Sequence, residues 1–599
     1  MGTIPARLST YCLTRRALFL GSLAAFVTAC GATETPTVPP VASAPPQASA
    51  APISALTPQP SAGAQASASS KPASAPSASA SAQASVAPTA VAKTGGSLTI
   101  RQWTGDPPDL DPFLNVTFRA QEFAGFFYSR LLKFDTGPNI QPNSFIPAPD
   151  LAESYTISED GLTYTFKLRA NAKWQNKAPL NGRAVTADDV IYSFERFRKV
   201  SPQKGNFDMV KEVKAPDQQT VVFTLNAVFA PFETSLASPL LWIMPKEVIE
   251  ADGDARKRVI GSGPFIFDRF EKGVQVVAKR NPDYYFTGTP YVDEVALLVV
   301  PEDATAVAGL RAKSIDINGL SASDRKAVAA SDPDIKLLEY PQNQLYFMYW
   351  RLDAPPFNDV RVRQAVSLAL DRDEMIGVLW EGTGFLNNSL PAGQRSFYLD
   401  PRSADMGPNA KYFKRDVAAA KKLLADAGFP DGLKVPMIAS LNAYGNTFNQ
   451  SVELVIKQLK DAGILADLRP QDYSAYISST FLGKFEPGTM VWGLETPYQE
   501  PHDYLFNMYH PKGGRNHAGV SDAKATEMIE KQMVTLDKAA RKTQIADIQR
   551  YLGGQQFYVM GVAGNTVIAT QPRIKNFFYE TDYGRGGEYV PKLFLDDKK

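Results

Sequence analysis

The stretch "LAESYTISEDGLTYTFKLRANAKWQNKAPLNGRAVTADDVIYSFER", residues 151–196, combines a strand pattern with a helix start. Apolar and polar side chains alternate from Leu162 to Leu168, and this period of two predicts a half-buried β-strand. Further along, Thr186 and Asp189 have the spacing of a capping box, which predicts a helix through "ADDVIYSFERF". A strand followed this closely by a helix indicates a fold of the mixed α/β class.

The same two patterns recur along the rest of the chain. Helices are predicted over residues 362–379 and 417–427, and the second of them ends at Gly428 with Pro430 beyond it. Strands are predicted between the helical stretches, over residues 220–225, 274–278 and 345–350.

Three short motifs are read as structural. "PPFND", residues 355–359, has turn chemistry that stops one strand and caps the next helix. "GSGPF", residues 261–265, is expected to form a turn before a strand, because Pro264 lacks the N–H that a phosphate loop needs. "DRD", residues 371–373, is expected on a solvated or salt-bridged face of a helix.

The first residues have the pattern of an export signal. "TRRA", residues 14–17, precedes an apolar run, and this run is too short for a permanent membrane span of about 20 residues. We therefore expect a signal peptide over residues 1–29. The paired arginines resemble a twin-arginine signal, and a general secretory signal is the open alternative. "VTAC" ends at Cys30 and resembles a lipobox, so Cys30 is the predicted lipidation site; an ordinary small residue there is the alternative.

Residues 30–94 are predicted to form a lipidated, disordered tether, because Ala, Ser and Pro dominate them and almost no aromatic or charged residue occurs. Beyond them, the chain has no cysteine for a disulfide or a metal. Over all 599 residues, 63 basic side chains face 62 acidic ones, so no nucleic-acid partner is expected.

Familiar catalytic motifs are missing from the sequence. There is no G-x-S-x-G, no H-E-x-x-H, no Walker A loop and no dinucleotide fingerprint. His502, His510 and His517 match no standard zinc spacing, and we expect them to be exposed loop residues near a ligand cleft. The sequence thus predicts that the chain is not an enzyme and holds no metal or cofactor.

A family resemblance extends over nearly the whole folded part. The opening stretch resembles the signature of the extracellular solute-binding proteins of family 5, the receptors of ABC importers for peptides, nickel and oligosaccharides. Other blocks follow in the family's order: "LDP" at 110, "GSGPF" at 261, "RNPDYY" at 280, "SIDI" at 314, "APPFNDVRVRQAVSLALDRDEM" at 354 and "AAAKKLLADAGFPDG" at 418. The resemblance implies a fold of the periplasmic-binding-protein type II kind.

The resemblance also implies three lobes, with a hinged ligand cleft between the first and the third. Residues 95–140, 246–345 and 570–599 would form lobe I, residues 141–245 lobe II, and residues 346–569 lobe III. Partners implied by the family are a peptide or other small solute and the transmembrane subunits of an ABC permease. We expect a monomer held outside the cytoplasm by its lipid anchor.

Ligand-binding candidates follow from the family pattern. In peptide-binding members an acidic residue three positions after a tryptophan binds the peptide ammonium, and here Glu495 follows Trp492 at that spacing; the alternative is an exposed loop carboxylate. Further candidates are aromatic or polar residues expected near the cleft, namely Tyr498, Trp350, Arg351, Trp103 and Asn516. Peptides are the leading cargo, an oligosaccharide or a nickel chelate is the alternative, and a secreted hydrolase is the remaining one.

Overall fold

The computed structural model describes residues 92–102, 106–115, 117–441, 444–495, 497–578 and 585–597. Cys30, Trp103, the predicted signal peptide and nearly all of the predicted tether lie outside these ranges. Strands and helices alternate along the described chain, which confirms the mixed α/β class. Within these ranges, no helix is both long enough and apolar enough to cross a membrane.

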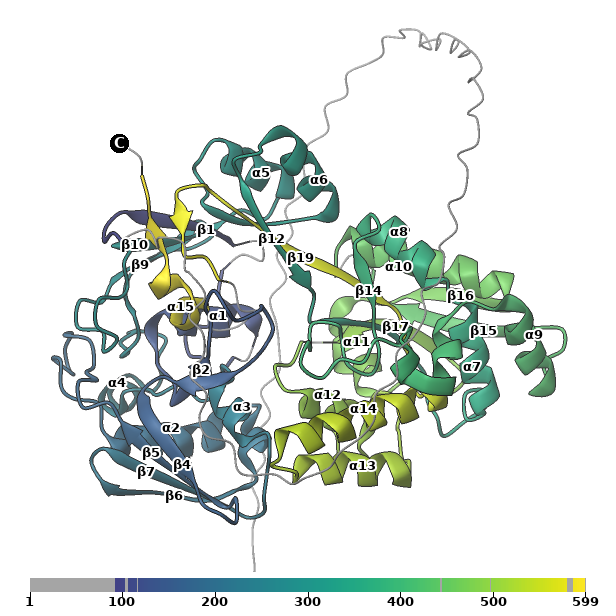
Figure 1. The fold of residues 1–599 in the computed structure, drawn as a ribbon, viewed down its shortest axis with the longest axis horizontal. Helices are drawn as coiled ribbons and strands as arrows, with labels where there is room; N and C mark the ends of the chain where they lie inside the picture. Colours follow the sequence, from purple (N-terminus) through teal and green to yellow (C-terminus); the bar gives the residue numbers. More distant parts are fainter. Residues whose placement is uncertain are drawn as a thin grey trace, which may run out of the picture. The chain divides into compact units, whose positions relative to one another are not determined.

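The largest sheet has eight strands and takes them from both ends of the chain (Figure 1). The strands are β1 (Ser97–Gln102), β8 (Phe265–Glu271), β9 (Gln275–Arg280), β10 (Glu294–Val299), β11 (Ile317–Leu320), β12 (Lys336–Pro341), β14 (Gly384–Leu386) and β19 (Val562–Thr570). β1 pairs in parallel with β10 and β11. β19 lies between β11 and β12 and pairs antiparallel with both, so this sheet needs residues from the two ends of the chain.

The opening stretch of the sequence lies in a four-stranded antiparallel sheet. The strands are β4 (Ala152–Ile157), β5 (Thr163–Leu168), β6 (Val210–Asp217) and β7 (Thr220–Leu225). β5 and β7 confirm the strands predicted there. Helix α2 (Ala187–Val200) packs on this sheet, with Phe194 edge-on to Phe223 at 5.6 Å between ring centres. The predicted capping box is present, since the Thr186 N–H donates to Asp189 Oδ2 at 2.9 Å.

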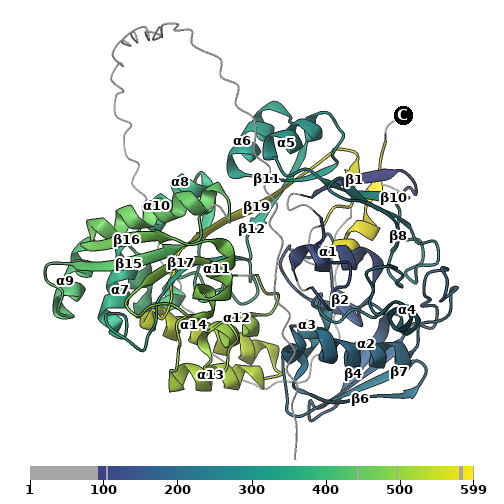
Figure 2. The same cartoon turned by 180° about the vertical axis from the view of Figure 1, so that it is seen from behind.

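A five-stranded sheet forms the centre of the other large part (Figure 2). The strands are β13 (Leu345–Tyr349), β15 (Leu433–Ala439), β16 (Ile464–Pro470), β17 (Met490–Glu495) and β18 (Val559–Met560). The helices of this part are α7 (Val360–Ala369), α8 (Arg372–Trp380), α9 (Val417–Asp426), α10 (Asn446–Asp461), α11 (Tyr473–Ser478), α12 (Pro501–Tyr509), α13 (Ala523–Met533) and α14 (Lys538–Gln555). β16, β15 and β17 run parallel to one another.

Smaller elements complete the described chain. The helices are α1 (Phe118–Phe127), α3 (Phe232–Ala237), α4 (Lys246–Asp252), α5 (Asp303–Arg311), α6 (Ala322–Ser331) and α15 (Arg585–Glu588). The strand pairs are β2 (Leu132–Phe134) with β3 (Pro147–Pro149) and β20 (Ile574–Lys575) with β21 (Phe594–Leu595). Short 3-10 turns are η1 (Lys204–Phe207), η2 (Ala404–Phe413), η3 (Thr480–Leu482) and η4 (Val590–Lys592).

The single helix predicted over residues 362–379 is wrong, because α7 and α8 are two helices. Asp371 has an extended backbone and accepts the Glu374 N–H at 2.9 Å, so it caps a new helix. Arg372 was expected on a solvated or salt-bridged face, and it is buried instead. Its Nε donates to the carbonyl of Met560 at 2.9 Å, which ties the start of α8 to β18. Burial lowers the pKa of Arg372 to about 9.

The predicted turns are confirmed. Asp359 of the "PPFND" motif caps α7 by accepting the Arg361 N–H. The "GSGPF" turn leads into β8 and lies against the end of α1. A Cβ at Gly263 would lie 2.6 Å from the carbonyl carbon of Phe127, so only glycine fits this close backbone approach.

The chain passes between the eight-stranded and five-stranded sheets at two short crossings, besides the longer segments that lead into and out of β14. One is the segment 342–344 between β12 and β13, and the other is Gly561, the only residue between β18 and β19. A Cβ at Gly561 would lie 2.7 Å from the Trp492 ring, so the crossing strand passes directly over that indole. Residues 346–569, the predicted lobe III, supply β14 and β19 to the larger sheet. The lobe boundaries themselves stay a prediction.

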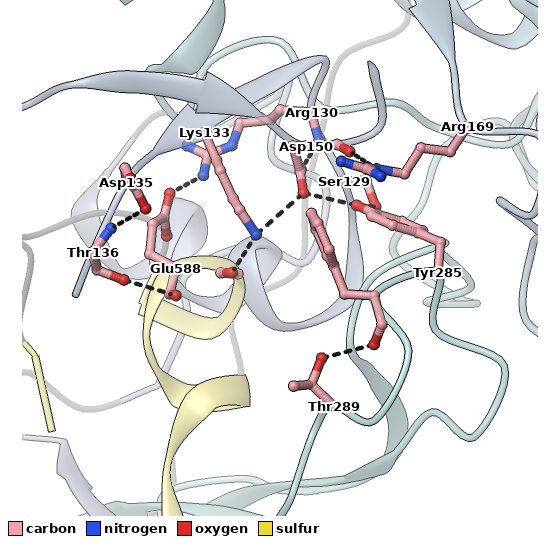
Figure 3. A network of polar contacts seen from close by, with 12 residues as sticks. Ser129, Arg130, Lys133, Asp135, Thr136, Asp150, Arg169, Tyr285, Thr289 and Glu588 are labelled. Carbon is pink, nitrogen blue, oxygen red and sulfur yellow. Dashed lines mark hydrogen bonds and ion pairs between the residues drawn. The ribbon is translucent and has the colours of Figure 1, made fainter. Parts of the chain in front are cut away.

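A buried polar network joins the C-terminal helix α15 to the region around β2 (Figure 3). The guanidinium of Arg130 pairs with the carboxylate of Glu588. Lys133 Nζ lies 3.7 Å from Asp150 Oδ1, and the Tyr285 hydroxyl donates to the same oxygen at 2.8 Å. Burial lowers the pKa of Lys133 and raises that of Glu588, since charged groups lose hydration in the interior.

Candidate functional site

The carboxyl ends of the parallel strands in the five-stranded sheet mark the candidate site. β16, β15 and β17 end on the same side, because parallel strands share one direction. In open α/β sheets, ligands bind beyond the carboxyl ends of such strands, where loops present side chains. Glu495 is the last residue of β17 and therefore lies at this edge.

Glu495 is fully buried and has two basic neighbours. Its Oε1 lies 2.5 Å from Arg515 Nη1, and its Oε2 lies 2.8 Å from His517 Nε2. Burial alone would raise the pKa of the carboxyl, but Arg515 and His517 outweigh it and hold that pKa below its usual value. We call these three residues the Glu495 cluster. The alternative prediction, that Glu495 is an exposed loop carboxylate, is therefore wrong.

His517 is held between the carboxylate and a backbone carbonyl. Its Nδ1 contacts the carbonyl oxygen of Phe481, while its Nε2 faces Glu495. The imidazole is fully buried and packs among aromatic rings, with ring centres 4.5 Å from Phe481 and 5.2 Å from Tyr349. The surrounding rings therefore fix its orientation.

Arg515 is the member of the cluster that reaches solvent. Its side chain is 29% exposed, against 0% for both Glu495 and His517. The guanidinium carbon lies 5.6 Å from the centre of the Phe481 ring and 5.5 Å from that of Tyr498. Arginine stacks well on aromatic faces, so the two rings orient the guanidinium at the edge of the sheet.

Three tyrosines follow the carboxyl ends of the parallel strands, on the side where the cluster lies. Tyr444 follows β15, Tyr473 follows β16 and Tyr498 follows β17, and the rings of Tyr444 and Tyr473 are 5.6 Å apart. Tyr473 is 49% exposed. Burial, with neighbouring tyrosines and Glu495, raises the pKa of the Tyr444 hydroxyl. The edge therefore combines charged groups with aromatic surface.

The loop that carries Tyr498 is bonded to the first crossing. The carbonyl oxygen of Tyr498 accepts from Asn343 Nδ2 at 2.6 Å and from Gln394 Nε2 at 2.7 Å. The Tyr504 hydroxyl donates to the carbonyl of Asn343 at 3.1 Å. Movement of the chain at residues 342–344 would therefore reach the candidate site directly.

The structure does not bring Trp492 and Trp350 to this edge. Successive side chains of a strand point to opposite faces, so a spacing of three places Trp492 and Glu495 on different faces of β17. Trp492 is fully buried and its Nε1 donates to Ser451 Oγ at 2.9 Å. Trp350 is also fully buried and stacks on Phe357 at 4.7 Å. Both tryptophans belong to the same core cluster.

Arg351 and Asn516 have partners within the chain. Arg351 Nε donates to Asp353 Oδ1 at 3.0 Å, on the surface. Asn516 holds its own loop, since its Nδ2 donates to the carbonyl of Val520 at 2.8 Å and its Oδ1 accepts the Val520 N–H at 2.7 Å. Trp103 lies outside the described residues.

The expectation of exposed histidines is wrong, because all three are buried. His502 Nδ1 accepts from Gln532 Nε2 at 2.8 Å, and His510 Nε2 lies 3.2 Å from Glu530 Oε1. Among the described residues, no group of three or more His, Cys, Asp and Glu is arranged to hold a metal. Arg515 and the tyrosines Tyr444 and Tyr473 were not predicted, because only the tertiary fold brings them to Glu495.

Two surface cavities lie away from the Glu495 cluster. One, of about 270 Å³, is lined by residues including Lys336, Thr570 and Phe577. The other, of about 230 Å³, is lined by residues including Arg311 and Gln571. The candidate site is thus defined by its side-chain chemistry and its place in the sheet.

Comparisons with known proteins agree with the resemblance seen in the sequence. Di/tripeptide-binding protein 1 of Pseudomonas aeruginosa is 26% identical over 522 residues, which cover 80% of this chain and 93% of that protein. Heme-binding protein A of Haemophilus influenzae is 26% identical over 495 residues, covering 76% and 86%. The crystal structure of the ABC transporter substrate binding protein CtaP from Listeria monocytogenes is 26% identical, has a TM-score of 0.70, and is matched over 84% of this chain and 100% of its own.

These similarities confirm the predicted fold class, of the periplasmic-binding-protein type II kind. The model of the "Bacterial extracellular solute-binding proteins, family 5 Middle" matches residues 147–516. This match spans more than half of the chain and includes the opening stretch, the first crossing and Glu495. The chain therefore belongs to the bacterial extracellular solute-binding proteins of family 5.

Proposed function

We propose that the chain is the extracytoplasmic substrate-binding receptor of an ABC importer and that it takes peptides. Membership of family 5 supports the receptor role, and the name of the Pseudomonas relative supports di- and tripeptides as the first solutes to test. The single observation that carries the proposal is the charged cluster among tyrosines at the carboxyl edge of the five-stranded sheet. Solute sites typically combine aromatic or apolar walls with a few polar anchors of this kind.

In this proposal the Glu495 cluster is the polar anchor, and Tyr473 and Tyr498 are the wall. Both tyrosines keep part of their surface exposed at the site. Trp103 stays a candidate contact.

The receptor would close by rotation at the two crossings, 342–344 and Gly561, with the three lobes as delimited from the sequence. Contacts between the segment before α3 and the end of α13 support a closed conformation. The Ala230 N–H donates to the carbonyl of Met533 at 2.8 Å. Leu536 lies against the backbone at Gly161, where a Cβ would come within 2.6 Å of its Cδ1. Opening would break these contacts.

The membrane anchor of the receptor would be the lipidated Cys30. An acylated cysteine contributes about 0.8 kcal/mol for each buried CH₂, and stable anchoring takes more than one chain. A Cys30→Ala variant should move from the membrane fraction to the soluble fraction. Retention of this variant in the membrane would refute the anchor and leave the receptor role untouched.

The receptor role is tested by ligand binding to the full chain. A library of di- to pentapeptides should raise its melting temperature in a thermal-shift assay, because a ligand that binds only the folded state stabilises it. Tyr498→Ala should weaken binding at least tenfold. The control Tyr412→Ala, which changes a half-buried tyrosine away from the site, in η2, should leave binding unchanged. No shift with any peptide would overturn peptides as the cargo.

The alternatives keep weaker support. The Haemophilus relative is named a heme-binding protein, so one protein similar to this chain is named for a solute other than a peptide. An oligosaccharide could stack on the tyrosines, whereas a nickel chelate would need histidines that in this fold are buried. A hydrolase would need a nucleophile beside a histidine, and the side-chain partners described for the histidines are glutamine and glutamate.

A further inference from the structure

Two parts of the chain that are far apart in sequence meet at His502. The Phe229 ring, from the segment before α3, lies edge-on to the imidazole with 5.3 Å between ring centres. One residue later, the Ala230 N–H donates to the carbonyl of Met533, the last residue of α13, at 2.8 Å. Phe229 belongs to the predicted lobe II and His502 to the predicted lobe III. The histidine therefore lies at a contact that opening would break.

The imidazole of His502 is buried between aromatic side chains. It is 5% exposed, and Phe229 is 8% exposed. Phe506 contacts the imidazole from within the same helix, with 5.2 Å between ring centres. Since Phe229 is the ring that comes from the other lobe, separation of the lobes would admit water to the imidazole while α12 stays folded.

Hydrogen bonds fix the neutral form of His502. Arginine has only donors, so the bond of 3.1 Å from Arg541 Nε identifies the acceptor on Gln532 as its amide oxygen. The amide nitrogen of Gln532 therefore donates to His502 Nδ1 at 2.8 Å and to the carbonyl of Ile529 at 3.1 Å. An additional proton on the imidazole would have to go to Nδ1, where it would face another donor.

The charges around His502 also oppose an imidazolium ion. The titratable groups near it come from the three helices packed there, and they are Glu500, Asp503 and His510 of α12, Glu530 of α13 and Arg541 of α14. Residues 226–231, which face it from the other lobe, include no titratable side chain. Burial and Glu500 raise the pKa of Asp503 to about 8, so Asp503 stays largely protonated between pH 7 and pH 5. Burial, with Arg541 and His510 nearby, lowers the pKa of His502 to about 3.

His502 is also linked to the loop that borders the candidate site. Its backbone N–H donates to Glu500 Oε1 at 3.1 Å, and Glu500 is the N-cap of α12. Tyr498, a wall residue of the proposed site, precedes this cap by two positions and is bonded to Asn343 at the first crossing. A change at the start of α12 therefore acts beside both the proposed wall and the first crossing.

We propose that closure of the receptor is coupled to the protonation of His502, so that acid pH favours the open conformation and releases the solute. The inference rests on the proposed closure and adds a condition that reverses it. In the closed conformation, the bond from Gln532 and the Phe229 ring exclude a proton from Nδ1. In the open conformation, water reaches the imidazole, which takes up a proton and gives up its bond with Gln532. A proton that binds one of two conformations shifts the equilibrium towards that conformation.

The size of the effect follows from the pKa in the two conformations. With the ordinary histidine pKa of about 6.5 in the open conformation, the preference for opening grows up to tenfold per pH unit below that value. At pH 5, solute affinity should therefore fall by up to about 30-fold through this group.

The first test measures peptide affinity of the full chain by calorimetry at pH 7 and pH 5, with tripeptides of Ala, Leu and Tyr. The affinity of the wild type should fall at least fivefold more than that of His502→Gln, whose amide oxygen can accept from Gln532 and takes up no proton. Phe229→Ala should also show a smaller fall than the wild type, because its imidazole is hydrated in both conformations. His510→Gln is the matched control. This buried histidine bonds with Glu530 and the Lys512 N–H, so its replacement should keep the full pH effect.

The second test follows opening without a solute. The Ala230 amide is protected by its bond to the carbonyl of Met533, so its hydrogen exchange, corrected for the intrinsic rate at each pH, reports the breaking of this contact. From pH 7 to pH 5 this protection should fall at least fivefold in the wild type and less than twofold in His502→Gln. The amides of β13 are the internal reference, because general unfolding would expose them as well.

Each outcome decides the inference. If the wild type and His502→Gln lose affinity equally, the receptor stands and the inference is overturned. If His510→Gln abolishes the pH effect, the effect does not arise at the contact with Phe229 and the inference falls. If no peptide binds at either pH, the proposed peptide receptor falls, and exchange of the Ala230 amide alone decides the inference: protection that is unchanged by pH overturns it, and protection that falls only with His502 present supports it.

Discussion

The buried pair of Arg130 and Glu588 predicts a large loss of stability for Glu588→Gln. The two side chains are only 1% and 2% exposed. Arg130 also donates to the carbonyl of Ala237 at 2.7 Å and lies over the Trp242 ring at 4.8 Å, so it cannot turn toward solvent without disturbing the core. Glutamine keeps the shape of the side chain but leaves the guanidinium without its counter-charge.

The size of the effect follows from burial and from the length of the unfolding unit. Breaking a buried ion pair at one partner costs about 3–5 kcal/mol. The compact unit from Pro88 to Lys599 should unfold with an entropy of about 1 kcal/mol/K, at about 2.1 cal/mol/K per residue. The melting temperature should therefore fall by about 3–5 °C.

Differential scanning calorimetry measures this shift, with Glu271→Gln as a matched control. Glu271 pairs with Arg269 on the surface, where the side chains are 43% and 47% exposed, and such pairs contribute about 0–1 kcal/mol. The control should shift the melting temperature by about 1 °C or less. An equally small shift for Glu588→Gln would refute the reasoning, because it would mean that Glu588 is held protonated and forms no ion pair.

Three further predictions concern pH, a turn and closure. Burial, with Arg541 nearby, lowers the pKa of His502 in the folded state to about 3. Below the unfolded pKa of about 6.5 only the unfolded state gains a proton, so the folded state loses up to about 1.4 kcal/mol of stability per pH unit. His502→Gln should therefore flatten the fall in melting temperature between pH 6.5 and pH 5. Gly263→Ala should lower the melting temperature by several degrees, because its Cβ would meet backbone at 2.6 Å, whereas Gly319→Ala, with open space around it, should change it little. Leu536→Ser should weaken solute binding with little change in melting temperature, since it loosens the contact with Gly161; unchanged affinity would exclude a role in closure.

Local patterns predicted the parts of the fold that are stabilised locally. β5 follows from the alternation of its own residues, and α2 from the capping box of Thr186 and Asp189. The break between α7 and α8 was missed because Asp371 can lie within a helix or cap one. Which of the two occurs depends on contacts such as that between Arg372 and Met560, which are distant in sequence.

The candidate site could be predicted only in part. Glu495 was found through a family pattern, but its partners Arg515 and His517 come from a loop after α12 that carries no local signal of pairing. The same pattern grouped Trp492 with Glu495, although a strand places them on opposite faces. Burial of the three histidines likewise depends on packing between elements that the sequence separates.

The position of β19 has a consequence for the way the chain matures. β11 and β12 do not pair with each other along the sheet but through β19, residues 562–570. A nascent chain must therefore carry β12 without a partner strand until residues 562–570 have been made. Long-range pairing of this kind slows folding, so the largest sheet should be among the last parts of the chain to form. Truncation before residue 562 should leave β12 unpaired and the product prone to aggregation.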